Sequence, residues 1–428
     1  MRRSTRVALL LALAACSKSN SGGTGPGPTG SLDITITAPG GVSAKVNVIT
    51  PSDSIITITS SQTVNGLAPG NYVVRAAAGV TNDPIVSTAY AGAVTGSPAN
   101  VTAGQTANAT VTYTSPRASS GMLWVANASA YSFPGFSSAN LAATGAPTPA
   151  VTIGSGASGS VIEGISSIAV DSSGGIWIAD NSDTLYYYAA SAITSNTDAH
   201  ATRKLISDSI QYAIALALDA SGDLWVADQA KSILLKFTPA QLAGGGVQSP
   251  SVIVHTAIGS IKRPWSIAFD HKGDLWIANY GDSTVVGFAP PQLASSGAPL
   301  PYAALTGSRG ISNCLGLAFD AQGNLWVATL TDTIAKFAPD QLTSFGSPTP
   351  SVILTIPGGA TPVGLAFDNS GSLWVGDYEG NKLYKLTSNQ ISTSGSPTPT
   401  VTITATNHSI SIPNGLTFSP AAQNLPIP

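Results

Sequence analysis

Residues 364–377 read GLAFDNSGSLWVGD, and this stretch decides the fold because the chain repeats it. Versions of it occupy residues 316–329, 266–279, 215–228 and 167–180. Six tryptophans follow one another at intervals of about fifty residues: Trp124, Trp177, Trp225, Trp276, Trp326 and Trp374. A period of this length, made only of strand-forming segments, is typical of a β-propeller in which each repeat forms one blade.

Each repeat predicts four strands, which we call A to D in chain order. Residues 364–368 are typical of strand A and residues 373–377 of strand B, while 334–337 and 351–354 are typical of strands C and D. In strand A, large residues such as Leu365 and Phe367 alternate with small ones such as Gly364 and Ala366. This is the period of a sheet that is covered on both faces. We expect the large face of each blade to pack on the small face of its neighbour.

The turn between strands A and B carries an aspartate in five repeats: Asp171, Asp219, Asp270, Asp320 and Asp368. The Asp-x-x-Gly spacing predicts a tight hairpin, with the aspartate capping the turn and not acting as a catalytic carboxylate. A second repeated element follows strand C, as in residues 337–350. It predicts one helical turn and a proline-rich lead into strand D, with a structural role.

The repeats are offset from the ends of the chain. Trp124 lies in a strand B that has no strand A before it, whereas residues 413–420 read PNGLTFSP and have no strand B after them. We therefore expect residues 121–428 to form a six-bladed propeller closed by its C-terminal strand. Closure leaves no open end to the ring of sheets.

The first sixteen residues have the features of an export signal. Arg2, Arg3 and Arg6 precede an apolar run over residues 7–15 that is too short to span a bilayer. The run ends in Leu-Ala-Ala-Cys16, which resembles a bacterial lipobox and implies that Cys16 is lipidated. Residues 17–30 then predict a flexible tether. Since Ser17 is not aspartate, sorting to the outer membrane is expected in a Gram-negative cell.

Residues 31–114 alternate apolar and polar residues over short stretches separated by turn residues. This pattern predicts a small antiparallel β-sandwich, so the whole chain is expected to be all-β. Residues 66–72, GLAPGNY, resemble the signature of carboxypeptidase-regulatory-like, transthyretin-like sandwiches. The resemblance implies that Pro69 and Gly70 make the turn, that Tyr72 starts the next strand, and that the module is a spacer.

The charge and cysteine content bear on the expected partners and on the role of the thiols. Only 9% of residues are charged, the net charge is −3, and no basic cluster follows the signal. Nucleic acid is therefore not an expected partner, because phosphate binding needs a concentrated basic face. If Cys16 is lipidated, Cys314 is the single remaining thiol, and we expect it to be a buried packing residue.

The repeat resembles NHL-type repeats and, more loosely, the gluconolactonase and virginiamycin B lyase propellers. The lactonases imply metal ligands at the start of strand A, where this chain has Ser166, Ile214, Trp265, Leu315, Val363 and Asn414. This set cannot supply the oxygens that a hard cation needs, and Glu163 is out of register, so no metal or other cofactor is expected. The lyases imply a histidine base, but the four histidines fall at different points of their repeats: His200, His255, His271 and His408. No catalytic residue is therefore assigned.

One polar feature remains, at the expected mouth of the ring. Strand B ends in Asn127, Asp180, Asp228, Asn279, Thr329 and Asp377, on the face where strand A begins. These side chains either cap hairpins or form a polar rim around the throat. A binding mouth would comprise Ser166, Asp180, Asp228, Trp265, Asn279, Asp377 and Asn414. The hypothesis is a lipid-anchored module that binds protein or glycan; the alternative is a hydrolase or lyase acting at the mouth.

Overall fold

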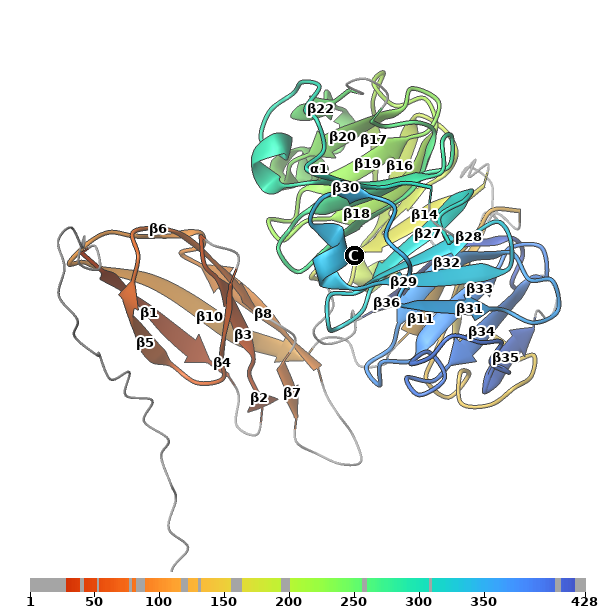
Figure 1. The fold of residues 1–428 in the computed structure, drawn as a ribbon, viewed down its shortest axis with the longest axis horizontal. Coiled ribbons are helices and arrows are strands. Elements are labelled where there is room, and N and C mark those ends of the chain that lie inside the picture. The colour runs from red at the N-terminus through yellow and green to blue at the C-terminus, as the bar shows by residue number, and fades with distance from the viewer. Residues whose placement is uncertain are drawn as a thin grey trace, which may run out of the picture.

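The computed structural model describes residues 28–38, 42–51, 54–76, 79–81, 89–116, 122–129, 132–154, 164–193, 201–255, 260–307, 310–404 and 409–419. Over these residues the protein is almost entirely β, in eight sheets (Figure 1). The predicted signal peptide with Cys16 lies outside the described residues, as do Glu163, His200 and His408. No helix in the described ranges is both long and apolar enough to cross a membrane.

Two sheets near the N-terminal end pack on one shared core that includes Leu32, Val46 and Tyr113. Their strands, in sheet order, are β2 (Val42–Ser43), β7 (Gly79–Thr81), β8 (Ala89–Thr95), β10 (Thr106–Pro116), β1 (Gly30–Thr37) and β5 (Gln62–Leu67), then β4 (Ile55–Ile58), β3 (Val46–Ile49), β6 (Gly70–Ala76) and β9 (Ala99–Val101). The expectation of purely antiparallel pairing is wrong for one pair, because β1 and β10 run parallel. Alternation along a strand reports which face a residue occupies and not the direction of the neighbouring strand.

The turn between β5 and β6 has the residues of the GLAPGNY motif. Strand β5 ends at Leu67 and β6 begins at Gly70, so the Ala-Pro pair forms the connection. Tyr72 is buried in the core, and its hydroxyl donates a hydrogen bond to the carbonyl of Ala68 at 2.9 Å. The tyrosine thereby fixes the turn that precedes its own strand.

The other six sheets are the blades, numbered here by the order of their tryptophans. Their strands, from the innermost outward, are: blade 1, β36 (Pro413–Ser419), β11 (Met122–Asn127), β12 (Ser132–Phe136) and β13 (Val151–Gly154); blade 2, β14 (Ser167–Val170), β15 (Ile176–Ala179), β16 (Thr184–Tyr188), β17 (Arg203–Ile206) and β21 (Gly246–Val247); blade 3, β18 (Ala213–Leu218), β19 (Leu224–Asp228), β20 (Ile233–Phe237) and β22 (Val252–Val254); blade 4, β23 (Pro264–Phe269), β24 (Leu275–Asn279), β25 (Thr284–Phe288), β26 (Ala303–Leu305) and β30 (Phe345–Gly346); blade 5, β27 (Cys314–Phe319), β28 (Leu325–Thr329), β29 (Thr333–Phe337) and β31 (Val352–Thr355); blade 6, β32 (Pro362–Phe367), β33 (Leu373–Asp377), β34 (Lys382–Leu386) and β35 (Val401–Thr404).

The six inner strands form a closed ring. Strands β14, β18, β23, β27, β32 and β36 each contact the next, and β36 contacts β14. Strand β36 comes from the C-terminal end of the chain and pairs antiparallel with β11, with Leu123 opposite Phe418 and Val125 opposite Leu416. Blade 1 is therefore built from two distant parts of the chain.

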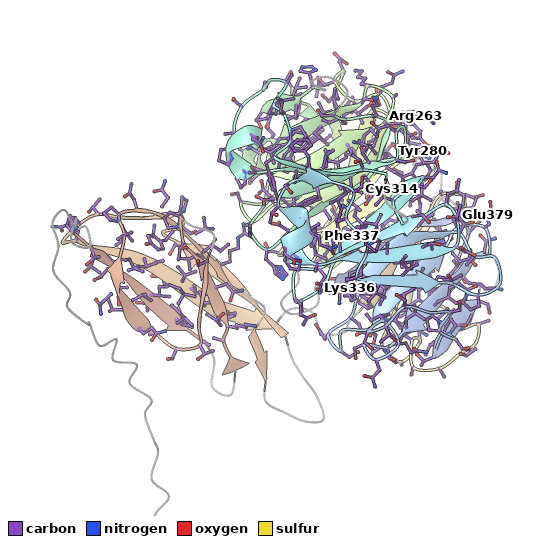
Figure 2. All side chains as sticks on the ribbon, in the orientation of Figure 1. Arg263, Tyr280, Cys314, Lys336, Phe337 and Glu379 are labelled. Atoms are coloured by element: carbon purple, nitrogen blue, oxygen red, sulfur yellow. The ribbon has the colours of Figure 1, made fainter. Side chains whose placement is uncertain are left out.

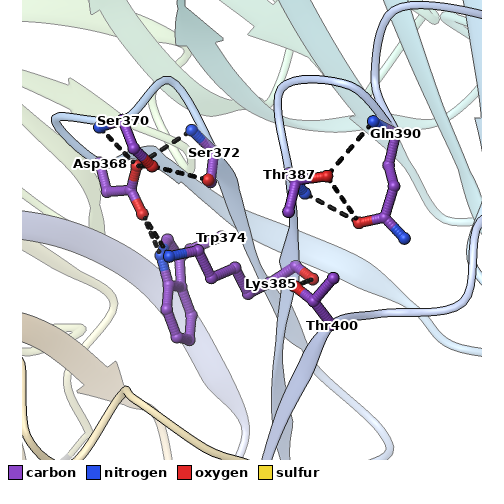
Figure 3. Close-up of polar contacts among 8 residues, drawn as sticks. All are labelled: Asp368, Ser370, Ser372, Trp374, Lys385, Thr387, Gln390 and Thr400. Atoms are coloured by element: carbon purple, nitrogen blue, oxygen red, sulfur yellow. Dashed lines mark hydrogen bonds and ion pairs between the residues drawn. The ribbon is translucent and has the colours of Figure 1, made fainter.

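The repeated tryptophan connects one blade to the next. Trp225 of blade 3 packs edge-on against Phe269 of blade 4 at 6.4 Å between ring centroids, and Trp276 does the same with Phe319 of blade 5. Its indole nitrogen is satisfied within its own blade, because Trp374 Nε1 donates to the A–B turn carboxylate of Asp368 at 3.2 Å (Figure 3). The tryptophan of strand B therefore contacts both the A–B turn of its own blade and the inner strand of the next blade.

The large and small faces of strand A have the roles that the alternation predicts. Leu317 and Phe319 pack with Trp276 of the preceding blade, while Ala318 packs against the core around Trp326 and Leu365. At Gly316 the approach is closest, because a Cβ atom there would lie 1.8 Å from the backbone oxygen of Val363 in β32. The inner strands of blades 5 and 6 touch through backbone at this point.

Replacement of Gly316 by alanine should therefore lower stability markedly. The added methyl group meets backbone that can move only if β27 separates from β32. Overpacking of this kind costs about 2–3 kcal/mol, which lowers the melting temperature of a propeller of this size by roughly 3–5 °C. The control is Gly346→Ala, where an added Cβ meets nothing within 4 Å. Equal melting temperatures for the two variants, measured by calorimetry, would contradict this close approach.

The element after strand C forms the expected helical turn. It is η1 (Ala190–Ala192) in blade 2, α1 (Pro239–Gly244) in blade 3, η2 (Pro290–Leu293) in blade 4 and η3 (Pro339–Leu342) in blade 5. In blade 5 the Gln341 side chain accepts from Ala338 N at 2.8 Å and donates to Thr349 O at 2.7 Å, which fixes the proline-rich segment. This supports the predicted structural role.

The segment that follows this turn reaches the preceding blade, which the sequence analysis did not predict. Strands β21 and β30 come from blades 3 and 5 but pair with the outer strands of blades 2 and 4. Single bridges make the same connection at three other blade pairs: Gly297 to Val254, Gly395 to Leu354 and Gly145 to Ile403. The last of these joins blade 1 to blade 6 on the outside of the ring.

Candidate functional site

A channel runs through the centre of the ring, between the six inner strands. It is lined by residues from every blade. Most of its lining is apolar, as at Ile214, Leu365 and Phe418. No ionisable side chain belongs to the lining within the described residues.

Three serine hydroxyls in the lining are used to join neighbouring inner strands. Ser166 Oγ donates to the carbonyl of Ala213 at 2.7 Å. Ser167 Oγ accepts from the amide of Leu216 at 3.0 Å, and Ser266 Oγ accepts from the amide of Leu317 at 3.2 Å. These serines stabilise the ring, and Ser166 uses its single O–H donor in doing so.

Three other polar atoms in the lining are buried without a hydrogen-bond partner among the described residues: Trp265 Nε1, Asn414 Oδ1 and Thr417 Oγ1. The amide nitrogen of Asn414 donates to Ser166 O at 2.8 Å, which leaves its oxygen as the free acceptor. Trp265 lies in blade 4 and the other two in blade 1, which is opposite in the ring. The channel thus offers a donor on one side and an acceptor and a hydroxyl on the other.

The expected polar rim must be corrected. Asp180, Asp228, Asn279 and Asp377 are at most 2% exposed and do not line the channel. Asp228 Oδ2 accepts from Tyr212 N and Oδ1 from Lys231 N, at 2.8 and 2.7 Å. Asp377 likewise accepts from Thr361 N at 3.0 Å. These side chains turn toward the amides of adjacent loops, because buried amides must be hydrogen-bonded. Of the seven candidate mouth residues, only Ser166, Trp265 and Asn414 line the channel.

The A–B turn aspartates cap their turns, as the spacing predicts. Asp320 Oδ1 accepts from the amides of Gln322 and Asn324 at 3.0 and 2.9 Å, and Oδ2 accepts from Trp326 Nε1. In blade 6, burial opposes the charged form of Asp368, but hydrogen bonds from Ser370 and Lys385 hold its pKa below the ordinary value. The carboxylates are therefore structural. The contact with the tryptophan six residues later was not predicted.

The thiol and the described histidines lie away from the channel lining. Cys314 is fully buried, and its Sγ lies 3.3 Å from Thr284 O. Burial raises the pKa of its thiol to about 12, so it stays protonated at neutral pH. His271 lies in the A–B turn of blade 4, where burial lowers its pKa. His255 is exposed at the end of blade 3.

The positions at which lactonase-like propellers would hold a metal do reach the channel, with one exception. Ser166, Ile214, Trp265, Val363 and Asn414 line it, whereas Leu315 is buried outside the lining. Among the described residues no three His, Cys, Asp or Glu side chains cluster as metal ligands would.

Sequence reasoning missed Thr417, although the repeat contains a signal for it. The equivalent position of strand A is alanine in the other five blades: Ala169, Ala217, Ala268, Ala318 and Ala366. Thr417 therefore places a hydroxyl where the repeat has only a methyl group. The hydroxyl has no hydrogen-bond partner in the part of the chain that the structure describes, so the packing of the ring does not account for it.

No protein-family model and no curated protein matches the chain. Among solved structures, a protein of unknown function from Bacteroides caccae has 13% identity and a TM-score of 0.50 over 70% of this chain and 99% of that one. Virginiamycin B lyase from Staphylococcus aureus has 16% identity and a TM-score of 0.38, over 53% of this chain and 67% of that one. A streptogramin B lyase has 16% identity and a TM-score of 0.39, over 59% and 82%. The likeness to the Bacteroides caccae protein concerns the fold alone, and that fold is the β-propeller.

Proposed function

We propose that this propeller is a binding module whose ligand enters the central channel with a neutral, hydroxyl- or amide-bearing segment. The observation that carries the proposal is a set of three polar atoms in a mostly apolar lining that have no hydrogen-bond partner among the described residues: Trp265 Nε1, Asn414 Oδ1 and Thr417 Oγ1. A buried polar atom without a partner costs about 1–3 kcal/mol. A ligand that supplies an acceptor and a donor would recover that energy on binding.

The lack of ionisable side chains in the described lining limits which chemical groups of a ligand can enter the channel. Without an ionisable group in its described part, the channel offers no compensation for a buried charge, which is expensive to desolvate. We therefore expect a neutral segment inside the channel, held by shape and by a few hydrogen bonds. Glycans and peptides both offer such segments, in agreement with the predicted class of partner.

Replacement of Thr417 by valine should make the protein more stable and weaken its binding of the ligand. The exchange keeps the volume and removes an unsatisfied hydroxyl, so we expect about 1 kcal/mol of added stability. Affinity for the ligand should fall about tenfold, which corresponds to one hydrogen bond. Calorimetry on the full chain in detergent, with a panel of neutral oligosaccharides and short peptides, measures both effects.

The matched control for this experiment is Thr329→Val. Thr329 is equally buried, but its hydroxyl donates to Thr333 O at 3.1 Å. Its loss should lower stability by about 1 kcal/mol and leave affinity unchanged. If Thr417→Val binds every member of the panel as the unaltered protein does, or if no member binds at all, a channel ligand of this kind is ruled out.

The hydrolase or lyase alternative stays a prediction. It needs an acid and a base that converge on the channel. His200, His408 and Glu163 lie outside the described residues, and the described lining contributes apolar, hydroxyl, amide and indole groups. No observation at the channel favours this chemistry over binding.

We also propose that lipidated Cys16 holds the module at the cell envelope, on the outer membrane if the cell is Gram-negative. The support is the charged start, the short apolar run and the Leu-Ala-Ala-Cys motif. The tether over residues 17–30 then separates the folded part from the lipid surface.

A further inference from the structure

The mouth of the channel has an unusual corner in blade 4. The register pairs Pro264 with Asn279, so Arg263 and Tyr280 lie side by side at the end of β23 and β24. The Arg263 guanidinium carbon lies over the Tyr280 ring at 5.4 Å. Tyr280 in turn contacts Trp265, with 5.6 Å between ring centroids and 53° between ring planes. Figure 2 labels Arg263 and Tyr280 close together at the edge of the propeller.

Arg263 is exposed, and no carboxylate of the described residues forms an ion pair with it. The adjacent cation is already paired, because Lys262 Nζ lies 3.5 Å from Asp282 Oδ2. The backbone of Arg263 is held in a left-handed conformation, with φ of 43°, while its amide donates to Ser232 Oγ of blade 3 at 3.0 Å. This strained backbone presents the guanidinium over the ring of Tyr280, with no carboxylate partner among the described residues.

We propose that this corner binds the carboxylate of an acidic sugar, so that the glycan class recognised by the channel is a uronate-containing oligosaccharide. The inference rests on the proposed function, because the next sugar of the glycan would occupy the channel. The guanidinium offers a planar pair of N–H donors that matches a carboxylate. The two inclined aromatic faces offer an apolar surface to the C–H groups of a sugar ring.

A sugar fits the remaining groups better than an acidic peptide does. Trp265 Nε1 is a donor, Asn414 Oδ1 an acceptor, and Thr417 Oγ1 can be either. Each hydroxyl of a sugar both donates and accepts, so the neutral sugars of an oligosaccharide can serve donors and acceptors alike without placing a charge in the channel. The charged group then stays outside, at Arg263, where it remains solvated.

The test compares two matched disaccharides, glucuronosyl-galactose and glucosyl-galactose with the same linkage, which differ by one carboxylate. Calorimetry with the full chain in detergent should show that glucuronosyl-galactose binds about tenfold more tightly at low salt. The preference should shrink as sodium chloride is added, because an exposed ion pair is screened. In Arg263→Gln the ratio of the two affinities should fall to about one. In the control Lys262→Gln, which removes a neighbouring but paired cation, the ratio should persist.

The outcomes separate this inference from the function on which it rests. Equal affinities for the two probes, or a preference that survives Arg263→Gln, would overturn the uronate site while the channel proposal stands. Binding of an acidic peptide alone would also overturn it. Trp265→Ala should weaken both probes, and if neither probe nor any neutral oligosaccharide or peptide binds the unaltered protein, the channel proposal itself fails.

Discussion

A chain that ends at Ser411 is expected to be insoluble, or to unfold far below the melting temperature of the full-length protein. The truncation removes β36, the inner strand of blade 1, and exposes the edge of β11. Burial of Phe418 alone is worth about 3–5 kcal/mol, against about 5–15 kcal/mol for a whole protein. The amide of Ile412, which donates to Asn381 Oδ1 of blade 6 at 2.6 Å, is lost as well.

A longer truncation and an added peptide make this test decisive. A chain ending at Asn424 retains β36 and should melt with the full-length protein. A synthetic peptide of residues 409–424 should restore the fold of the chain that ends at Ser411, since a free strand can pair with an exposed sheet edge. If the chain ending at Ser411 melts cooperatively at the full-length temperature, β36 does not close the ring.

Replacement of Cys16 by serine should release the protein completely from the membrane fraction. One side chain is proposed to carry the lipid, and each buried methylene of an acyl chain contributes about 0.8 kcal/mol to membrane binding. Fractionation with immunoblotting follows the release, and mass spectrometry follows the acyl mass on the N-terminal peptide.

The control for anchoring is the other cysteine. Cys314 is buried in blade 5, so Cys314→Ser should stay with the membrane whatever its effect on stability. Unchanged membrane partitioning of Cys16→Ser, together with an N-terminal peptide that carries no acyl mass, would refute the lipoprotein proposal.

The ring of inner strands could be predicted from sequence because each strand A carries its own signature of alternating large and small residues. The segment around Leu416 and Phe418 matches that signature and has no strand B after it, so it could only complete blade 1. By contrast, β21 and β30 are two residues long and their partners lie in another blade. No local periodicity can report such a pairing.

The candidate site was predicted only in part. Ser166, Trp265 and Asn414 could be placed at the channel because they begin a strand A. The side chains of Asp228 and Asp377, at the end of strand B, could point toward solvent or toward the amides of an adjacent loop. The sequence does not distinguish these orientations, and the structure shows the second. Thr417 is distinguished by a hydroxyl that has no partner among the described residues, and Arg263 and Tyr280 are distinguished by their contact with each other. Both properties exist only in the folded structure.

The bridges between outer strands and following blades have a consequence for how this propeller loses its structure. In an open solenoid the terminal repeats have one neighbour each, so unfolding can begin there and spread. Here the inner strands close through β36, and the bridge from Gly145 to Ile403 closes the same junction on the outside. No blade is therefore terminal in the way that the end repeat of a solenoid is. The ring should remain intact until its blades separate in one cooperative transition.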